Sequence, residues 1–128
     1  MTAEDHSVHK ILVIDDNAEH RELVHRTLTA RGYCVFQAAD AETGLQLAIE
    51  QQPDLLVVDL GLPDVDGQTL IGHLKHMAAF AETPIIACTA WPEETARSMV
   101  EVYGCDGYIS KPIRTADFAT RIASYLRR

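Results

Sequence analysis

The stretch Asp54-Leu-Leu-Val-Val-Asp59 lies near the middle of the chain and is followed by the glycine- and proline-containing run Leu60-Gly-Leu-Pro-Asp-Val-Asp-Gly67. A short, continuous apolar run is typical of a β-strand buried on both faces, as in a parallel sheet covered by helices. Similar runs recur at residues 10–15, 33–38, 84–88 and 107–110. The sequence therefore predicts five buried strands.

The segments between these strands have apolar residues at the spacing of amphipathic helices. Residues that cap or stop helices flank them: Gly32, Asp40, Pro53, Pro92 and Gly104. The expected inward faces are Leu23, Val24, Thr27 and Leu28; Ala41, Leu45, Ala48 and Ile49; Leu70, Leu74 and Met77; Ala96, Met99, Val100 and Tyr103; and Phe118, Ile122, Tyr125 and Leu126. Five strands alternating with five helices predict an α/β fold with a doubly wound parallel sheet.

Length and composition fit one ordinary globular domain. The chain has 128 residues, of which 47% are hydrophobic and 23% charged. We expect residues 1–9 to be a polar N-terminal lead and residues 10–128 to form the domain. A net charge of −8 argues against direct binding of nucleic acid, and no apolar run approaches the ~20 residues needed for membrane insertion. Three widely spaced cysteines predict a reduced, cytoplasmic localisation.

Polar side chains stand where the predicted strands end. Asp15 and Asp16 follow the first strand, Asp59 ends the third, Thr89 follows the fourth and Lys111 follows the fifth. Right-handed crossovers bring the carboxyl ends of parallel strands to one edge, which is where ligands bind in such sheets. Each residue alone has an ordinary structural explanation, such as a helix cap, a turn or a solvated charge. Four such strand ends at one edge favour a shared site.

Three carboxylates in one pocket limit the chemistry that the site can perform. Two carboxylates about 5 Å apart repel by about 3 kcal/mol at an effective dielectric constant near 20. Such a cluster takes up protons, recruits a lysine or binds a hard cation. Oxygen ligands with positions open for water and phosphate suit Mg²⁺, and a carboxylate beside that ion can attack phosphorus.

The Asp-Asp pair, Asp59 with the run after it, Thr89-Ala90 and Lys111-Pro112 occur in an order and spacing that resemble the receiver domain of bacterial response regulators, the CheY-like family. The resemblance extends over residues 10–126. It implies a flavodoxin-like sheet with strand order 2-1-3-4-5. It also implies a phosphorylation-activated switch that catalyses only its own phosphorylation and dephosphorylation, and is not an enzyme for a separate substrate. The implied partners are a histidine kinase or histidine phosphotransfer protein, and an unidentified downstream protein.

The resemblance assigns the phosphorylation site residue by residue. Asp59 is the implied phosphoacceptor, and Lys111 would pair first with Asp59 and then with the phosphoryl group. Mg²⁺ would be held directly by Asp16, Asp59 and the backbone carbonyl of Gly61, and through water by Asp15.

The resemblance also implies a conformational switch. Thr89 would be drawn to a phosphoryl oxygen and Tyr108 would then turn inward, while the peptide bond before Pro112 would be cis. Two positions depart from the usual family pattern, because Gly61 offers no side chain and Trp91 a very large one. These positions border the path of the attacking water in the family, so the lifetime of the phosphorylated state stays open.

Other functions fit the sequence less well. An aspartyl-nucleophile phosphohydrolase needs an Asp-x-Asp pair after its first strand, where this chain has adjacent carboxylates. The stretch Asp64-Val-Asp66 resembles part of a calcium loop but lacks the required glutamate. A flavodoxin-like cofactor binder shares the fold, but an Asp-Asp pair would repel phosphate there.

Two further questions concern the histidines and the context of the domain. The histidines, His20 among them, have no evident set of co-ligands, and we expect them to be solvated. A free-standing regulator, a phosphate shuttle and a receiver excised from a hybrid kinase all fit the sequence. The N-terminal methionine and the short lead favour the first.

Overall fold

The computed structural model describes residues 8–126, so most of the expected N-terminal lead lies outside the described residues. The strands are β1 (Lys10–Ile14), β2 (Cys34–Ala38), β3 (Leu55–Asp59), β4 (Ile85–Thr89) and β5 (Gly107–Ser110). The helices are α1 (Ala18–Thr29), α2 (Ala41–Gln51), α3 (Gly67–Lys75), α4 (Glu93–Tyr103) and α5 (Thr115–Leu126), with a short 3₁₀ helix η2 (Ala78–Phe80) before β4.

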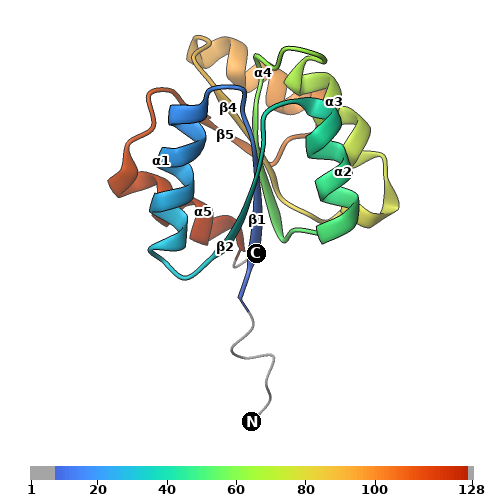
Figure 1. Cartoon of the computed structure of the whole chain (residues 1–128). Helices are drawn as coiled ribbons and strands as arrows, with labels where there is room; N and C mark the ends of the chain where they lie inside the picture. The colour runs from blue at the N-terminus through green and yellow to red at the C-terminus, as the bar shows by residue number, and fades with distance from the viewer. Residues whose placement is uncertain (1–7, 127–128) are drawn as a thin grey trace.

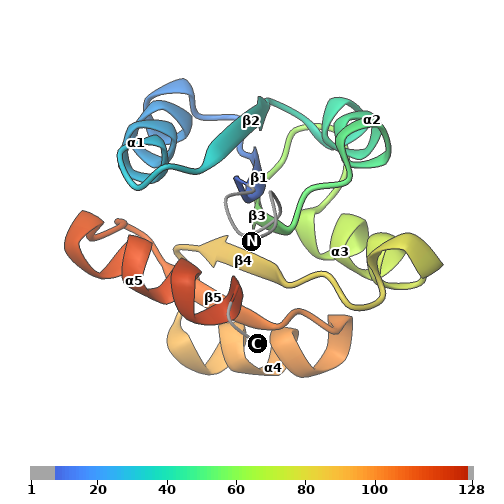
Figure 2. The same cartoon turned by 90° about the horizontal axis from the view of Figure 1, so that it is seen from below.

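All five strands are parallel, and their order across the sheet is β2-β1-β3-β4-β5. The predicted doubly wound fold is therefore confirmed. Figure 1 shows the sheet edge-on between two layers of helices, and Figure 2 shows α1 and α5 beside one face of the sheet with α2 and α3 on the other. Because the strands are parallel, their carboxyl ends share one edge.

The sheet separates two hydrophobic cores, since successive side chains of a strand point to opposite faces. The core under α1 and α5 contains Ile11, Val13, Leu55, Val57, Ile86, Ile109, Val24, Leu28, Phe118 and Ile122. The core under α2, α3 and α4 contains Leu12, Ile14, Leu56, Val58, Ile85, Ala87, Ala48, Leu70, Leu74 and Met99. The central strands are buried along both faces, as their continuous apolar sequences predicted.

Helix ends follow the local sequence closely. The carboxylate of Asp40 accepts a hydrogen bond from the backbone N–H of Thr43 at 2.7 Å and caps α2. Gly32 and Gly104 have φ values of +92° and +80° after α1 and α4, a conformation that glycine adopts without strain.

The prediction of an inward-facing side chain was wrong for two residues. Ile49 is 50% exposed and Tyr103 is 38% exposed. Ile49 follows the fully buried Ala48 by one residue, which turns it about 100° around the helix axis and out of the contact face. Tyr103 is the last residue of α4, so no further turn of this helix covers its ring.

Candidate functional site

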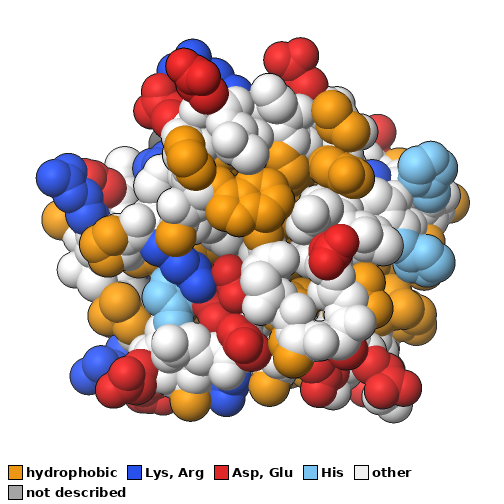
Figure 3. Space-filling view, turned by 90° about the horizontal axis from the view of Figure 1, so that it is seen from above, with side chains coloured by type: hydrophobic (Ala, Val, Ile, Leu, Met, Phe, Trp, Pro, Cys, Tyr) orange, Lys and Arg blue, Asp and Glu red, His pale blue; other side chains and the backbone are white. Residues whose placement is uncertain are grey.

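Three carboxylates meet at the carboxyl edge of the central strands. Asp15 and Asp59 are buried and Asp16 is exposed, and one oxygen from each lies within 4.8 Å of the others. Within residues 8–126 this is the only group of three or more Asp, Glu, His or Cys side chains close enough to share a metal ion. Viewed down onto this edge, acidic side chains gather near the centre beside basic and histidine side chains (Figure 3). The structure thus brings together the carboxylates that the sequence singled out.

Lys111 reaches into the carboxylate cluster from the end of β5. Its Nζ lies 3.0 Å from Asp59 Oδ1 and 3.4 Å from Asp15 Oδ2. Its backbone N–H donates to the carbonyl of Thr89 at 2.8 Å, and its peptide bond to Pro112 is cis. Burial lowers the pKa of the Lys111 ammonium, but the hydrogen bond to Asp59 and the charges of both carboxylates outweigh it and raise that pKa above its usual value. Lys111 is therefore a cation at neutral pH.

Asp15 is held by donors from the start of α1. Oδ1 accepts a hydrogen bond from the backbone N–H of Asn17 at 2.9 Å, and Oδ2 is bonded to the ring Nδ1 of His20. Burial raises the pKa of Asp15, whereas these bonds and the charge of Lys111 lower it, and the net effect is a pKa below the usual range. Asp15 is consequently a buried carboxylate anion.

The expectation that His20 is solvated was wrong, because its side chain is only 13% exposed and bonds to Asp15. His20 is thus a site residue that the sequence reading missed. Its signal is the spacing Asp15-x-Asn17-x-x-His20 across the end of a strand and the first turn of a helix, with Asn17 as the N-cap.

Thr89 stands at the end of β4 with its side chain buried. Its Oγ1 accepts a hydrogen bond from the backbone N–H of Trp91 at 2.9 Å, which leaves the hydroxyl hydrogen available as a donor. The register pairs Thr89 with Ser110 and Ala87 with Tyr108, so Tyr108 and Thr89 share one face of the sheet. The half-buried Tyr108 packs against the core under α2, α3 and α4.

The loop between β3 and α3 folds back over Asp59. Gly61 lies beside the carboxylate, since a methyl group built on it would be 3.8 Å from Asp59 Oδ2. Gly67 approaches the backbone much more closely: a methyl group there would lie 2.2 Å from the Asp59 backbone oxygen and 2.6 Å from Leu60 Cα. The backbone N–H of Gly67 donates to the carbonyl of Leu60 at 3.1 Å. Glycine at position 67 is therefore required for this approach.

Asp64, in the same loop, points away from the carboxylate cluster. Its carboxylate accepts hydrogen bonds from the backbone N–H groups of Ala41, at 2.9 Å, and Glu42, at 3.1 Å, at the start of α2. The bond from Ala41 is the main cause of a pKa below the usual value for Asp64. This carboxylate therefore stabilises the N-terminus of α2, and the resemblance of residues 64–66 to a calcium loop has no structural counterpart.

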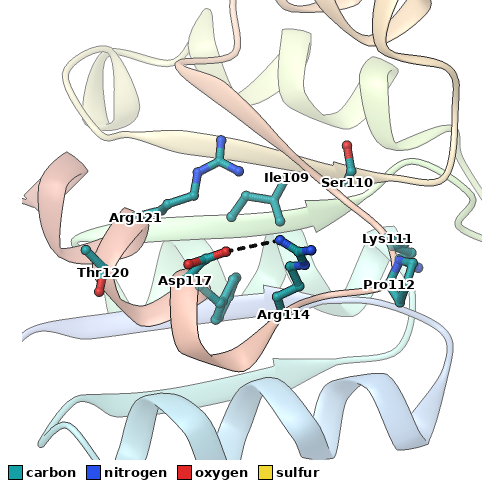
Figure 4. A pocket seen from close by; sticks show the side chains of 9 residues that line it. Ile109, Ser110, Lys111, Pro112, Arg114, Asp117, Thr120 and Arg121 are labelled. Carbon is teal, nitrogen blue, oxygen red and sulfur yellow. Dashed lines mark ion pairs between the residues drawn. The ribbon is translucent and has the colours of Figure 1, made fainter.

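A pocket lies beside Lys111, between the end of β5 and α5 (Figure 4). Arg114 and Arg121 line it, and Arg114 pairs with Asp117 at 3.7 Å. Arg121 donates to the backbone carbonyl of Tyr108 at 2.7 Å, which blocks an acceptor on the open edge of β5. The pocket thus presents positive charge next to the site.

The three cysteines are free. Burial raises the pKa of the Cys88 thiol to about 12 and that of Cys105 to about 11, while Cys34 is exposed on β2. Among residues 8–126, no helix has the length and apolar character needed to cross a membrane.

A parallel sheet in this order, with buried carboxylates and a lysine at its carboxyl edge, defines the receiver class of signalling proteins. Residues 11–123 match the family model of the response regulator receiver domain, so the chain belongs to that family.

Sequence relatives differ in how much of their length this chain covers. It is 36% identical over 119 residues to the DNA-binding dual master transcriptional regulator RpaA of Synechocystis sp., covering 93% of this chain and 49% of that protein. It is 33% identical over 116 residues to the polar-differentiation response regulator DivK of Brucella anthropi, covering 91% of this chain and 94% of that protein. The chain thus spans about half the length of RpaA and nearly all of DivK.

Solved structures have the same fold. A CheY-like response regulator receiver domain protein from Methanospirillum hungatei superposes with a TM-score of 0.87 at 26% identity, covering 94% of this chain and 95% of that one. Receiver domains are signalling switches of two-component systems that take phosphoryl groups from histidine kinases, bind Mg²⁺ at an acidic pocket and act on downstream targets.

Proposed function

We propose that this chain is a phosphorylation-activated switch of a cytoplasmic phosphorelay, in which Asp59 accepts a phosphoryl group from a histidine kinase or a histidine phosphotransfer protein. The observation that carries the proposal is the contact of 3.0 Å between Lys111 Nζ and Asp59 Oδ1, inside a cluster of three carboxylates. A lone carboxylate paired with lysine would be a structural ion pair, whereas the surplus of negative charge indicates a site for a cation.

The donor set fits Mg²⁺. All three side chains offer oxygen, and exposed Asp16 makes no ion pair or hydrogen bond through its side chain within the described part of the chain. Asp16, Asp59 and the Gly61 carbonyl would hold the ion directly, with Asp15 acting through water. When bound, Mg²⁺ neutralises charge on the transferring phosphoryl group.

The protein's own residues carry the transfer. An oxygen of the Asp59 carboxylate forms a bond to phosphorus as the phosphorus–nitrogen bond to the donor histidine breaks, and the imidazole leaves with the bonding electron pair. Lys111 already contacts Asp59, so its ammonium can pair with a phosphoryl oxygen without a large movement. The donor histidine is released without its phosphoryl group, and the phosphorylated product is this protein itself.

The signal then passes through Thr89 and Tyr108. A phosphoryl oxygen that accepts the Thr89 hydroxyl hydrogen binds one position of this side chain better than another, which is the condition for a population shift. Tyr108 lies on the same face of the sheet, where it is paired with the small Ala87 of β4. The surface of α4, β5 and α5 would be read by the downstream protein.

Intact-mass measurement tests the proposal. With Mg²⁺ and a small phosphodonor, the wild-type protein and the surface control Asp117→Asn should each gain one phosphoryl group, and Asp59→Asn should gain none. Equal labelling of Asp59→Asn, or labelling that survives chelation of the metal, would contradict it. Asp16→Ala should weaken Mg²⁺ binding without lowering metal-free stability, because it relieves repulsion among the carboxylates.

A further inference from the structure

Within residues 8–126 the ring of His20 makes a single polar contact, and this contact goes to Asp15. Nδ1 bonds to Asp15 Oδ2, while Nε2 is buried and has no hydrogen-bond partner in the described residues. Burying a ring nitrogen without a partner is unfavourable. The ring is therefore held in an orientation that serves the bond to Asp15 and leaves its second nitrogen unpaired.

Figure 1 shows where β1 ends and α1 begins. In this part of the chain, local hydrogen bonds join Asp15, Asn17 and His20 into a closed network. The backbone N–H of Asn17 donates to Asp15 Oδ1 at 2.9 Å, and the backbone N–H of His20 donates to the side-chain oxygen of Asn17 at 3.0 Å. The ring Nδ1 of His20 is hydrogen-bonded to Asp15 Oδ2 and closes the network. The main chain of Asp15 is fixed as well, since Arg21 Nη1 donates to its carbonyl at 2.8 Å.

This hydrogen-bond network orders the carboxylate of Asp15 and leaves that of Asp16 free. Asp15 has both oxygens engaged and its side chain is only 2% exposed. Asp16 is exposed and takes no part in this hydrogen-bond network. An ordered carboxylate loses little further conformational freedom when a hydrated cation binds, so the groups that order it contribute to affinity.

We propose that His20 is a positioning residue that holds the Asp15 carboxylate in place for a hydrated divalent cation, through a hydrogen bond from the Nδ1 position. This inference rests on the proposed function, because it assumes that Asp15 takes part in the metal site. Partners of this kind typically change metal affinity by about 10- to 100-fold. The effect expected for His20 is at the low end, since it acts through Asp15.

Three substitutions separate positioning from packing. The amide nitrogen of asparagine lies as many bonds from Cα as His20 Nδ1 does, whereas that of glutamine matches Nε2. His20→Asn should therefore keep Mg²⁺ affinity within about twofold of wild type, while His20→Gln and His20→Ala should each weaken it about tenfold. His25→Asn on the same helix is the matched control and should leave affinity unchanged.

Isothermal titration with Mg²⁺ measures these affinities, at a temperature where urea titration in chelator shows each variant to be folded. Equal weakening in all three His20 variants would indicate general loss of packing and would overturn the proposal, as would wild-type affinity in His20→Ala. If wild type and His25→Asn fail to bind Mg²⁺, the proposed function itself fails. If they bind and the His20 variants do not follow the stated order, only the inference about His20 fails.

Discussion

Replacing Gly67 with alanine would force a methyl group into the backbone that carries Asp59. The added carbon would lie 2.2 Å from the Asp59 carbonyl oxygen and 2.9 Å from its carbonyl carbon. Ordinary carbon–oxygen contacts need about 3.3 Å, so α3 and the end of β3 would have to separate by about 1 Å. Overpacking typically costs about 1–3 kcal/mol. Since the obstructing atoms are backbone and cannot rotate away, we expect Gly67→Ala to lose about 3 kcal/mol.

Gly72→Ala is the matched control, because it makes the same change within the same helix. Its new methyl group would meet only Tyr103 Cδ1, at 3.9 Å. Gly72 lies inside α3, where alanine is favoured over glycine by up to about 1 kcal/mol. The two variants should therefore shift stability in opposite directions.

Urea unfolding followed by circular dichroism measures both changes, with similar m-values as the check that the transition is unaltered. In thermal melts Gly67→Ala should lose about 10 °C or more. It should also be phosphorylated more slowly than Gly72→Ala, since the displaced backbone positions the acceptor. A Gly67→Ala variant within about 1 kcal/mol of wild type, or a Gly72→Ala variant destabilised to the same degree, would refute the reasoning about close approach.

Three further outcomes are expected. Asp64→Asn should be less stable than wild type at neutral pH. Because the pKa of Asp64 is lowered in the folded state, its carboxylate stabilises the fold fully above the unfolded pKa of about 3.9 and loses this effect as pH falls through the folded pKa. Urea titrations in which the stability difference between wild type and Asp64→Asn does not depend on pH would contradict this. At pH 8 a thiol reagent should label Cys34 alone in the native protein and all three cysteines in urea, and rapid native labelling of a second thiol would show that the raised pKa values do not protect the buried groups. Fluorescence of Trp91 should shift when Mg²⁺ and a beryllium fluoride phosphoryl mimic are added. Thr89→Ala should remove most of the shift, because the backbone N–H of Trp91 donates a hydrogen bond to the Thr89 hydroxyl. An equal shift in Thr89→Ala would count against the coupling.

The sequence predicted the sheet and the positions of the polar residues at its edge for one shared reason. Buried strands such as β3 are apolar throughout, so their ends are easy to locate, and parallel topology then brings those ends together. The proximity of Asp59 and Lys111 follows from this topology, although they are 52 positions apart in the sequence (111 − 59).

Contacts that depend on how a helix or loop is oriented could not be predicted in the same way. The bond from His20 to Asp15 depends on the angle at which α1 leaves the sheet, and the helical apolar pattern does not contain that angle. The bonds from Asp64 to the start of α2 join residues 22 and 23 positions apart across two loops. Ile49 was misplaced because a one-residue offset on a helix decides between core and solvent.

The division of the interior into two cores gives the molecule two independent sides. Side chains two positions apart on a strand lie on the same face of the sheet. Asp59 is therefore on the face of Val57, which packs under α1 and α5, whereas Thr89 is on the face of Ala87, which packs under α2, α3 and α4. Substitutions on opposite sides of the sheet share few neighbours, so their effects on stability should nearly add. A chimera could therefore take the outer surfaces of α1 and α5 from one relative and those of α2 and α3 from another, and each exchange should change stability by about the same amount alone as in combination.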